Sequence, residues 1–282
     1  MNKPILLDGA VGTSLWAKAD ARGIAREPVW TYNITHPEIV AELVGDYAAA
    51  GAQMILANTF GANSPAVKRS SSYTTPQVVK AGVEIAKEAL KGTGIPTMLS
   101  MGPLSSLIEP YGDTTEEECE EIYTEMLEAG IGAGADAVMI QTFFDLAMIN
   151  IAAQAAVRYG KPVFCTLTFE KSGKTIMGNS VKDCIDTLEP LGISGIGINC
   201  SLGPEAAFPI VKEFSEKAHI PVVYKPNAGL PISAGGGQAA ISAPDFADQL
   251  VSAFPLVGYI GGCCGSDPSY IKEIRKRIDQ ID

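Results

Sequence analysis

The sequence predicts an α/β protein in which eight strand–helix units close into a (β/α)8 barrel, the TIM barrel architecture. Three observations predict it. Eight short apolar runs alternate with segments of helical period. The chain has 282 residues, which suits a fold that typically takes about 250. Several loops that follow strands are longer than the loops that precede them, as in barrel enzymes. We expect one barrel domain over residues 1–282, with a doubly wound open sheet as the alternative.

The eight apolar runs are interpreted as strands. Val, Ile and Leu follow one another in them without polar alternation, which is typical of parallel strands buried on both faces. The predicted strands are Ile5–Asp8, Gln53–Thr59, Pro96–Met101, Ala137–Thr142, Pro162–Phe169, Gly195–Cys200, Pro221–Asn227 and Tyr259–Cys264.

The segments between the strands are interpreted as helices. Thr35 with Glu38, and Thr114 with Glu117, match the capping box that starts a helix. A cap at Ser266 or Asp267, followed by a proline, starts the last helix, whose apolar stripe comprises Ile271, Ile274 and Ile278. Further helices are predicted over Thr75–Lys91, Asp145–Tyr159, Ser180–Leu191, Pro204–Ala218 and Ala243–Phe254.

Composition excludes several classes of partner. The net charge is -11, and an acidic surface repels nucleic-acid phosphates, so we expect no nucleic-acid partner. No apolar run reaches the ~18 residues of a membrane span, and the N-terminus lacks the apolar core of a signal peptide. We therefore expect a cytoplasmic protein whose six cysteines are thiols.

Polar residues and cysteines recur where the predicted strands end. In a barrel these ends share one mouth, where barrel enzymes keep their active sites. The residues are Asp8, Asn58, Gln141, Cys200, Asn227, Cys263 and Cys264. Three thiolates and one open position are typical of a catalytic zinc, and the helix starts that follow the cysteines favour thiolates. Buried small residues or a vicinal disulfide are the alternatives that spacing leaves open.

The other candidate groups fit structural roles. Cys119, Cys165 and Cys184 lie within predicted helices or strands and are expected to be buried. His36 and His219 do not fall at the predicted mouth, so no His-dependent triad is expected. The glycine run at 235–237 is interpreted as a flexible flap and not as a phosphate-binding loop.

Several motifs together resemble the zinc-dependent homocysteine S-methyltransferases. The matching stretches begin at Asp8-Gly9-Ala10 and Ala57-Asn58-Thr59-Phe60. Strand six and its loop, Gly195 to Pro204, resemble the first cysteine motif, and Gly261-Gly262-Cys263-Cys264-Gly265 resembles the second. Pro226-Asn227-Ala228-Gly229-Leu230-Pro231 resembles a motif between them. Within the family, the chain is most similar to the homocysteine-binding module of cobalamin-dependent methionine synthase.

The resemblance implies a zinc ion held by Cys200, Cys263 and Cys264, with the substrate thiol in the fourth position. It implies that Asn227 lies beside the metal, and that Asp8, Gly9 and Ala10 help to hold the amino acid end of homocysteine. At the end of strand four this chain has Gln141-Thr142 where the family usually has Glu-Thr, whose Glu pairs with the substrate ammonium. Gln supplies no charge.

The expected function is methyl transfer to a zinc-bound thiol, with homocysteine giving methionine. The chain ends at Asp282 without room for folate or cobalamin modules, so we expect a separate corrinoid protein to bring methylcobalamin, although a small sulfonium or betaine donor is an alternative. Two other interpretations stay open: a different thiol, because of Gln141, and a non-catalytic module whose zinc is structural.

Overall fold

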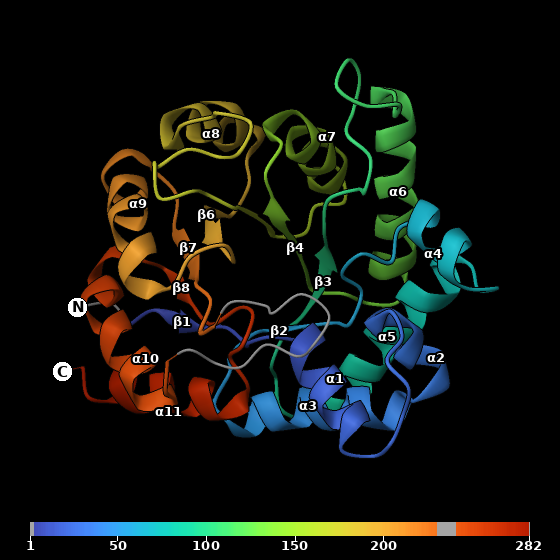
Figure 1. Ribbon diagram of the computed structural model, residues 1–282, viewed down its shortest axis with the longest axis horizontal. Coiled ribbons are helices and arrows are strands. Elements are labelled where there is room, and N and C mark those ends of the chain that lie inside the picture. Colours follow the sequence, from blue (N-terminus) through green and yellow to red (C-terminus); the bar gives the residue numbers. More distant parts are fainter. Residues whose placement is uncertain (1–2, 230–240, 282) are drawn as a thin grey trace.

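Eight parallel strands form the centre of the fold. The computed structural model describes residues 3–229 and 241–281, and within them the sheet order is β1-β8-β7-β6-β5-β4-β3-β2. β1 and β2 stand at the two ends of this order, and an isolated parallel bridge between Leu7, just after β1, and Met54, just before β2, connects them. Helices surround the strands (Figure 1), which confirms the predicted (β/α)8 barrel. The strands are β1 (Ile5–Leu6), β2 (Ile55–Leu56), β3 (Thr97–Met101), β4 (Ala137–Phe143), β5 (Val163–Leu167), β6 (Gly195–Asn199), β7 (Val222–Lys225) and β8 (Tyr259–Ile260).

The helices follow the strands in the order expected for βα units. They are α1 (Gly12–Asp20), α2 (Tyr32–Thr35), α3 (Pro37–Ala49), α4 (Ser64–Ser70), α5 (Thr75–Ala89), α6 (Glu116–Gly132), α7 (Leu146–Val157), α8 (Val181–Leu188), α9 (Pro204–Lys217), α10 (Ala243–Leu250) and α11 (Pro268–Asp279). Short 3-10 helices cover Val29–Thr31, Glu189–Leu191 and Val251–Leu256. The short α1, α2 and α4 lie in loops for which the sequence predicted no helix.

Two predicted helix starts were wrong. Thr35 does not cap α3; it ends α2, and its hydroxyl donates to the carbonyl of Thr31 at 3.2 Å. The predicted box at Thr114 lies one residue too early, because Thr115 caps α6 and exchanges hydrogen bonds with Glu118. At α6, the neighbouring Thr114 and Thr115 offer overlapping four-residue patterns, and the structure uses the second. At α3, the helix begins at Pro37 after His36, whose side chain makes no capping hydrogen bond.

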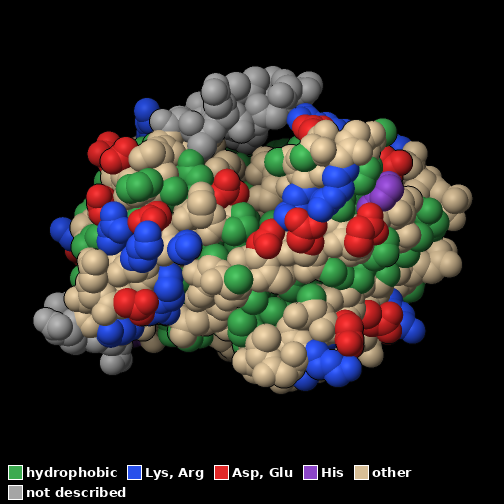
Figure 2. All heavy atoms as spheres, turned by 90° about the horizontal axis from the view of Figure 1, so that it is seen from below, with side chains coloured by type: hydrophobic (Ala, Val, Ile, Leu, Met, Phe, Trp, Pro, Cys, Tyr) green, Lys and Arg blue, Asp and Glu red, His purple; other side chains and the backbone are tan. Residues whose placement is uncertain are grey.

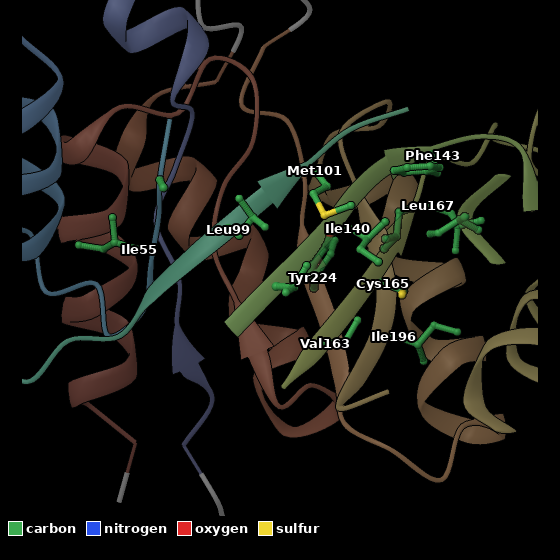
Figure 3. Packing of buried hydrophobic residues seen from close by; sticks show 14 of the residues in the cluster. Ile55, Leu99, Met101, Ile140, Phe143, Val163, Cys165, Leu167, Ile196 and Tyr224 are labelled. Carbon is green, nitrogen blue, oxygen red and sulfur yellow. The ribbon is translucent and has the colours of Figure 1, made fainter. Parts of the chain in front are cut away.

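The core has two layers, one on each side of the barrel wall. The outer layer packs the strands against the helices and includes Leu99, Ile140, Cys165 and Ile196, whose side chains cluster in Figure 3. The inner layer lies inside the barrel and comprises Leu7, Leu56, Met98, Ala137, Met139, Phe164 and Val223. Because side chains alternate along a strand, the residue two positions after an inner-layer residue also faces the interior, one level nearer the mouth.

Replacing Gly197 with alanine is expected to destabilise the barrel by at least about 3 kcal/mol, because overpacking against backbone cannot relax. A Cβ at this position in β6 would lie 1.9 Å from the carbonyl oxygen of Val223 in β7. Gly45→Ala in α3 is the control: nothing lies within 4 Å of its Cβ, and alanine should stabilise the helix by about 0.5–1 kcal/mol. Thermal unfolding of the two variants, compared with wild type, should shift in opposite directions; a Gly197→Ala protein as stable as wild type would contradict the packing.

The surface mixes charges of both signs. On the face shown in Figure 2, acidic and basic side chains lie interspersed in small groups. Ion pairs account for some of them: Lys18 of α1 contacts Glu42 and Asp46 of α3 at 2.6 and 2.7 Å. Among the helices that the structure describes, none combines the length and the apolar character required to cross a bilayer.

Candidate metal and substrate site

Three cysteine sulfurs converge at the mouth of the barrel. Cys200 directly follows β6, and Cys263 and Cys264 follow β8. The three Sγ atoms all lie within 4.8 Å of one another, and those of Cys200 and Cys264 are 3.7 Å apart. Residues that are distant in sequence therefore form one cluster, as the barrel prediction requires.

Backbone hydrogen bonds and unusual dihedral angles place these sulfurs. The amide of Cys200 donates to the Lys225 carbonyl at 3.0 Å, and that of Cys263 donates to the Pro226 carbonyl at 2.8 Å, so both loops are tied to the end of β7. Cys200 and Ser201 have φ values of 57° and 54°, in the left-handed region that residues with a Cβ rarely adopt. Such angles turn the chain sharply at the strand end and cluster at functional sites.

The spacing of the sulfurs fits a zinc ion. With Zn–S bonds of about 2.3 Å and tetrahedral angles, two ligating sulfurs should lie about 3.8 Å apart. The distance of 3.7 Å between Cys200 and Cys264 agrees with this value. Around such an ion the three sulfurs would fill three corners of a tetrahedron, and no other Cys, His, Asp or Glu of residues 3–229 and 241–281 joins the group, so the fourth corner would be left for an external ligand. The residues present therefore fit the metal that the sequence predicted.

Close contact among the three thiols shifts their pKa values in opposite directions. Hydrogen bonds from Cys263 and Cys264 lower the pKa of Cys200, with smaller contributions from the Ser201 backbone and the Asn227 amide. Contact with Cys200 raises the pKa values of Cys263 and Cys264, because a second thiolate beside the first is disfavoured. Without a cation the cluster therefore favours one thiolate, on Cys200; a divalent cation would favour all three.

The remaining cysteines are structural. Cys119, Cys165 and Cys184 are buried, and burial raises their pKa values, to about 12 for Cys119 and Cys184. Figure 3 shows Cys165 among apolar side chains between strands and helices. Their predicted burial is confirmed.

A polar layer lies between the sulfurs and the apolar interior of the barrel. Four of its five members follow an inner-layer residue by two positions, so they face the interior at the level of the mouth. The layer comprises Ser100, Gln141, Thr166, Asn199 and Lys225, and all five are buried. Its residues come from β3 to β7, so this layer surrounds the space beneath the sulfur cluster.

Asp8 and Lys225 form an ion pair inside this layer. Lys225 Nζ lies 2.6 Å from Asp8 Oδ1, and the two side chains are 2% and 0% exposed. The other oxygen of Asp8, Oδ2, accepts a hydrogen bond from the Leu56 amide at 2.8 Å. Both oxygens of the predicted substrate-binding carboxylate are thus engaged within the protein, and Lys225 neutralises its charge.

Gly9 and Ala10, also predicted to contact the substrate, are fixed by backbone contacts beside the cysteine loop. The Ala10 amide donates to the Ser266 carbonyl at 2.8 Å, and the Tyr47 hydroxyl donates to the Ala10 carbonyl at 2.7 Å. A Cβ on Gly9 would lie 2.5 Å from the Ser266 carbonyl oxygen, so only glycine permits this approach. The loop after β1 therefore lies against the loop that carries Cys263 and Cys264.

Gln141, Thr142 and Asn227 reach the same mouth. Gln141 Nε2 donates to Ser100 Oγ at 2.9 Å, and Thr142 has a φ of 67° within an irregular stretch of β4. Asn227 is 3% exposed, yet neither polar atom of its amide makes a regular hydrogen bond to the residues described. Apart from its contact with Cys200, this buried amide has no partner among residues 3–229 and 241–281, which suggests a position where a ligand belongs. The amide nitrogen of Asn58, another polar strand end, donates instead to Asn33 Oδ1 and to the Val29 carbonyl.

Sequence reasoning missed Asn199 and Lys225. A lysine at the end of the apolar run Val222-Val223-Tyr224 was a usable signal, because a charge at a buried strand position requires a partner. Asn199 gave a weaker signal: its position beside Cys200 was part of the motif, but nothing in the sequence indicated its contacts. The predicted flap at 235–237 and the motif residues Leu230 and Pro231 lie outside the described residues.

Comparison with known proteins identifies the family. The model of the homocysteine S-methyltransferase family matches residues 5–278. The chain belongs to the homocysteine S-methyltransferase family. This result confirms the family, and with it the enzyme class, that the sequence motifs predicted.

Relatives of this homocysteine S-methyltransferase family member include much longer proteins. It is 30% identical to methionine synthase of Mycobacterium tuberculosis and 31% identical to that of Mycobacterium leprae, over 97% and 96% of this chain. The chain spans 24% of the length of each. A metallated form of the homocysteine methyltransferase MmuM from Escherichia coli has the same fold, with a TM-score of 0.80 and 23% identity over 98% of this chain and 96% of that one.

Proposed function

We propose that this protein is a zinc-dependent methyltransferase that transfers a methyl group to the thiol of homocysteine and forms methionine. The observation that carries the proposal is the sulfur cluster of Cys200, Cys263 and Cys264, whose spacing leaves one tetrahedral corner free. Family membership supports homocysteine as the acceptor. A cytoplasmic location remains a prediction from the sequence.

Different residues of the chain would bind the metal and the acceptor. Cys200, Cys263 and Cys264 would hold the zinc ion, which when bound supplies the charge that keeps an acceptor thiol deprotonated at neutral pH. Asn227, whose buried amide approaches Cys200 but makes no regular hydrogen bond to a nitrogen or oxygen of the described residues, would border the fourth position. The loop at Gly9 and Ala10, together with Gln141 and Thr142, would orient the amino acid end of the acceptor; Asp8 would act through this loop and through Lys225.

We propose methylcobalamin, presented by a corrinoid-binding protein or domain, as the methyl donor. The motifs most similar to cobalamin-dependent methionine synthase support this choice, as does the similarity to methionine synthases four times as long as the aligned region. The acceptor sulfur would lie at the barrel mouth, where a partner can approach it.

The decisive experiment combines binding with product analysis. Zinc-loaded protein is mixed with homocysteine, and X-ray absorption at the zinc edge should show a sulfur shell that grows from three to four. Methylcobalamin, a sulfonium and a betaine are then offered as donors, and methionine is measured by mass spectrometry. If the sulfur shell does not change and no donor yields product, the zinc is structural and the proposal is wrong.

A second acceptor class is favoured by the charges at the mouth. Gln141 is neutral, and the carboxylate of Asp8 is paired with Lys225 of the polar layer. The segment 230–240 contains no Asp or Glu in its sequence. Homocysteine would therefore find no free carboxylate among these groups to pair with its ammonium group. A thiol without an α-ammonium group needs no such partner and would bind without that loss.

Gln141→Glu is expected to strengthen homocysteine binding about tenfold, because a charge-assisted hydrogen bond to an ammonium contributes about 1–3 kcal/mol more than no partner. Binding of 4-mercaptobutanoate, which is homocysteine without its amino group, should not improve. Calorimetry with the zinc-loaded protein measures both thiols. Gln154→Glu, the same change on the exposed face of α7, is the control.

The wild-type protein decides between the two acceptor classes in the same titrations. A preference for homocysteine supports methionine formation, whereas a preference for 4-mercaptobutanoate supports the second class. Equal responses of both thiols to Gln141→Glu would show that residue 141 does not contact the amino end.

A further inference from the structure

The carboxamide of Asn199 connects three strands to a metal-binding cysteine. Its Oδ1 accepts hydrogen bonds from the Thr142 amide at 2.7 Å and from Thr166 Oγ1 at 2.8 Å. Its Nδ2 donates to Thr142 Oγ1 at 2.7 Å and to Cys263 Sγ at 3.7 Å. Asn199 itself is completely buried, whereas Thr142 and Cys263 are partly buried.

These contacts fix the orientation of the amide. The Thr142 backbone amide can only donate, so the atom that faces it must be the oxygen of Asn199. The amino group must then point toward Thr142 Oγ1 and Cys263 Sγ. A flipped amide would place an N–H group against the Thr142 N–H and an oxygen against the sulfur. Since both acceptor positions and both hydrogens are used, one N–H is committed to Cys263.

The same contacts support an unusual conformation at Thr142. A φ of 67° is strained for a β-branched residue and costs of the order of 1–3 kcal/mol. Asn199 holds both the backbone amide and the hydroxyl of Thr142, which forms a closed pair of hydrogen bonds. One side chain thus links the irregular stretch of β4 that carries Gln141 to the sulfur of Cys263.

We propose that Asn199 is a positioning residue for the metal centre: it holds Cys263 Sγ in ligating geometry, withdraws charge from that thiolate through an N–H···S bond, and couples the sulfur to β4. Groups that hydrogen-bond to metal ligands orient them and tune the metal, and their loss typically costs 10–100-fold in affinity. The inference rests on the proposed zinc site and adds a residue that is not itself a ligand.

Asn199→Asp tests the donor, because it keeps the shape and replaces the amino group by oxygen. Zinc affinity is measured by competition with a chromophoric chelator, and the Co(II)-substituted protein is examined for its sulfur-to-cobalt charge-transfer absorption. We expect zinc binding about 10–100-fold weaker and a shifted charge-transfer band. Asn199→Ser, which removes the amide donor without adding charge and leaves only a shorter hydroxyl, should change both readouts in the same direction.

Thr166→Val is the matched control. It removes one hydrogen bond to Asn199 Oδ1 and leaves the donor to the sulfur in place. We expect its zinc affinity to change by less than about threefold, against the 10–100-fold loss expected for the Asn199 variants. Its charge-transfer band should be unchanged. If Asn199→Asp and Asn199→Ser keep the wild-type affinity and spectrum, or if Thr166→Val alters them equally, Asn199 has only a structural role.

The outcomes separate this inference from the proposed function. A wild-type protein that binds neither zinc nor cobalt would contradict the metal centre itself. If the wild-type protein binds both metals and the Asn199 variants have the same zinc affinity and cobalt spectrum as wild type, only the positioning role is contradicted.

Discussion

Single replacement of Cys200, Cys263 or Cys264 by alanine is expected to abolish stable zinc binding, from about one ion per chain to a small fraction. A site with three protein ligands loses a third of its sulfur donors, and the free energy of such sites depends on every thiolate. Metal analysis after dialysis against a weak chelator gives the stoichiometry. Methyl transfer to the acceptor thiol should be lost together with the metal.

Cys165→Ala and Cys184→Ala are the matched controls, because both thiols are buried among apolar side chains away from the cluster. They should retain zinc, although each is expected to lose a little stability from the missing sulfur contacts. A Cys263→Ala protein with as much zinc as wild type would refute the assignment of the three ligands.

Lys225→Met is expected to destabilise the protein by about 3–5 kcal/mol, because it leaves the Asp8 carboxylate buried without a counter-charge. The two charged groups are 2.6 Å apart, and both side chains are almost fully inaccessible. For a domain of this size the loss corresponds to a fall in the thermal midpoint of about 10 °C. Calorimetry of the metal-free and zinc-loaded proteins measures it.

Two further variants distinguish the effect of breaking the ion pair on stability from the effect of removing a lysine. Lys212→Met removes an exposed lysine paired with Glu216 at 3.8 Å and should change stability by less than about 0.5 kcal/mol. The double variant Asp8→Asn with Lys225→Met should recover most of the loss, because no isolated charge remains. If Lys225→Met is as stable as wild type, Asp8 has another partner or remains hydrated.

The ion pair of Asp8 and Lys225 also affects which acceptor thiol the site can bind. Asp8 was expected to hold the amino acid end of homocysteine, but in the structure its two oxygens contact Lys225 and the Leu56 amide. Binding of an ammonium group by Asp8 would require Lys225 to move. The thiol titrations proposed above therefore report on the β7 lysine as well as on Gln141.

Local patterns predicted the regular elements well and their ends less well. The apolar runs located all eight strands, and Asp267 caps α11 as expected, accepting from the Ser269 amide at 2.7 Å. The caps of α3 and α6 were each predicted one residue too early: Thr114 and Thr115 compete for the cap of α6, and α3 begins without a side-chain cap. The short α1 and α4 lie in strand-to-helix loops, where tertiary packing rather than a long apolar period stabilises a helix.

The sequence alone determined the barrel and the sulfurs that could meet, because burial on both faces of a strand requires continuous apolar runs and because the strand ends of a barrel share one mouth. Tertiary structure decided what those strand ends contact: that Lys225 crosses to Asp8, and that Asn199 joins Thr142 to Cys263. These pairs are 217, 57 and 64 residues apart in the chain. Their contacts depend on strand register and on the direction of each side chain inside the barrel, which no pattern of neighbouring residues records.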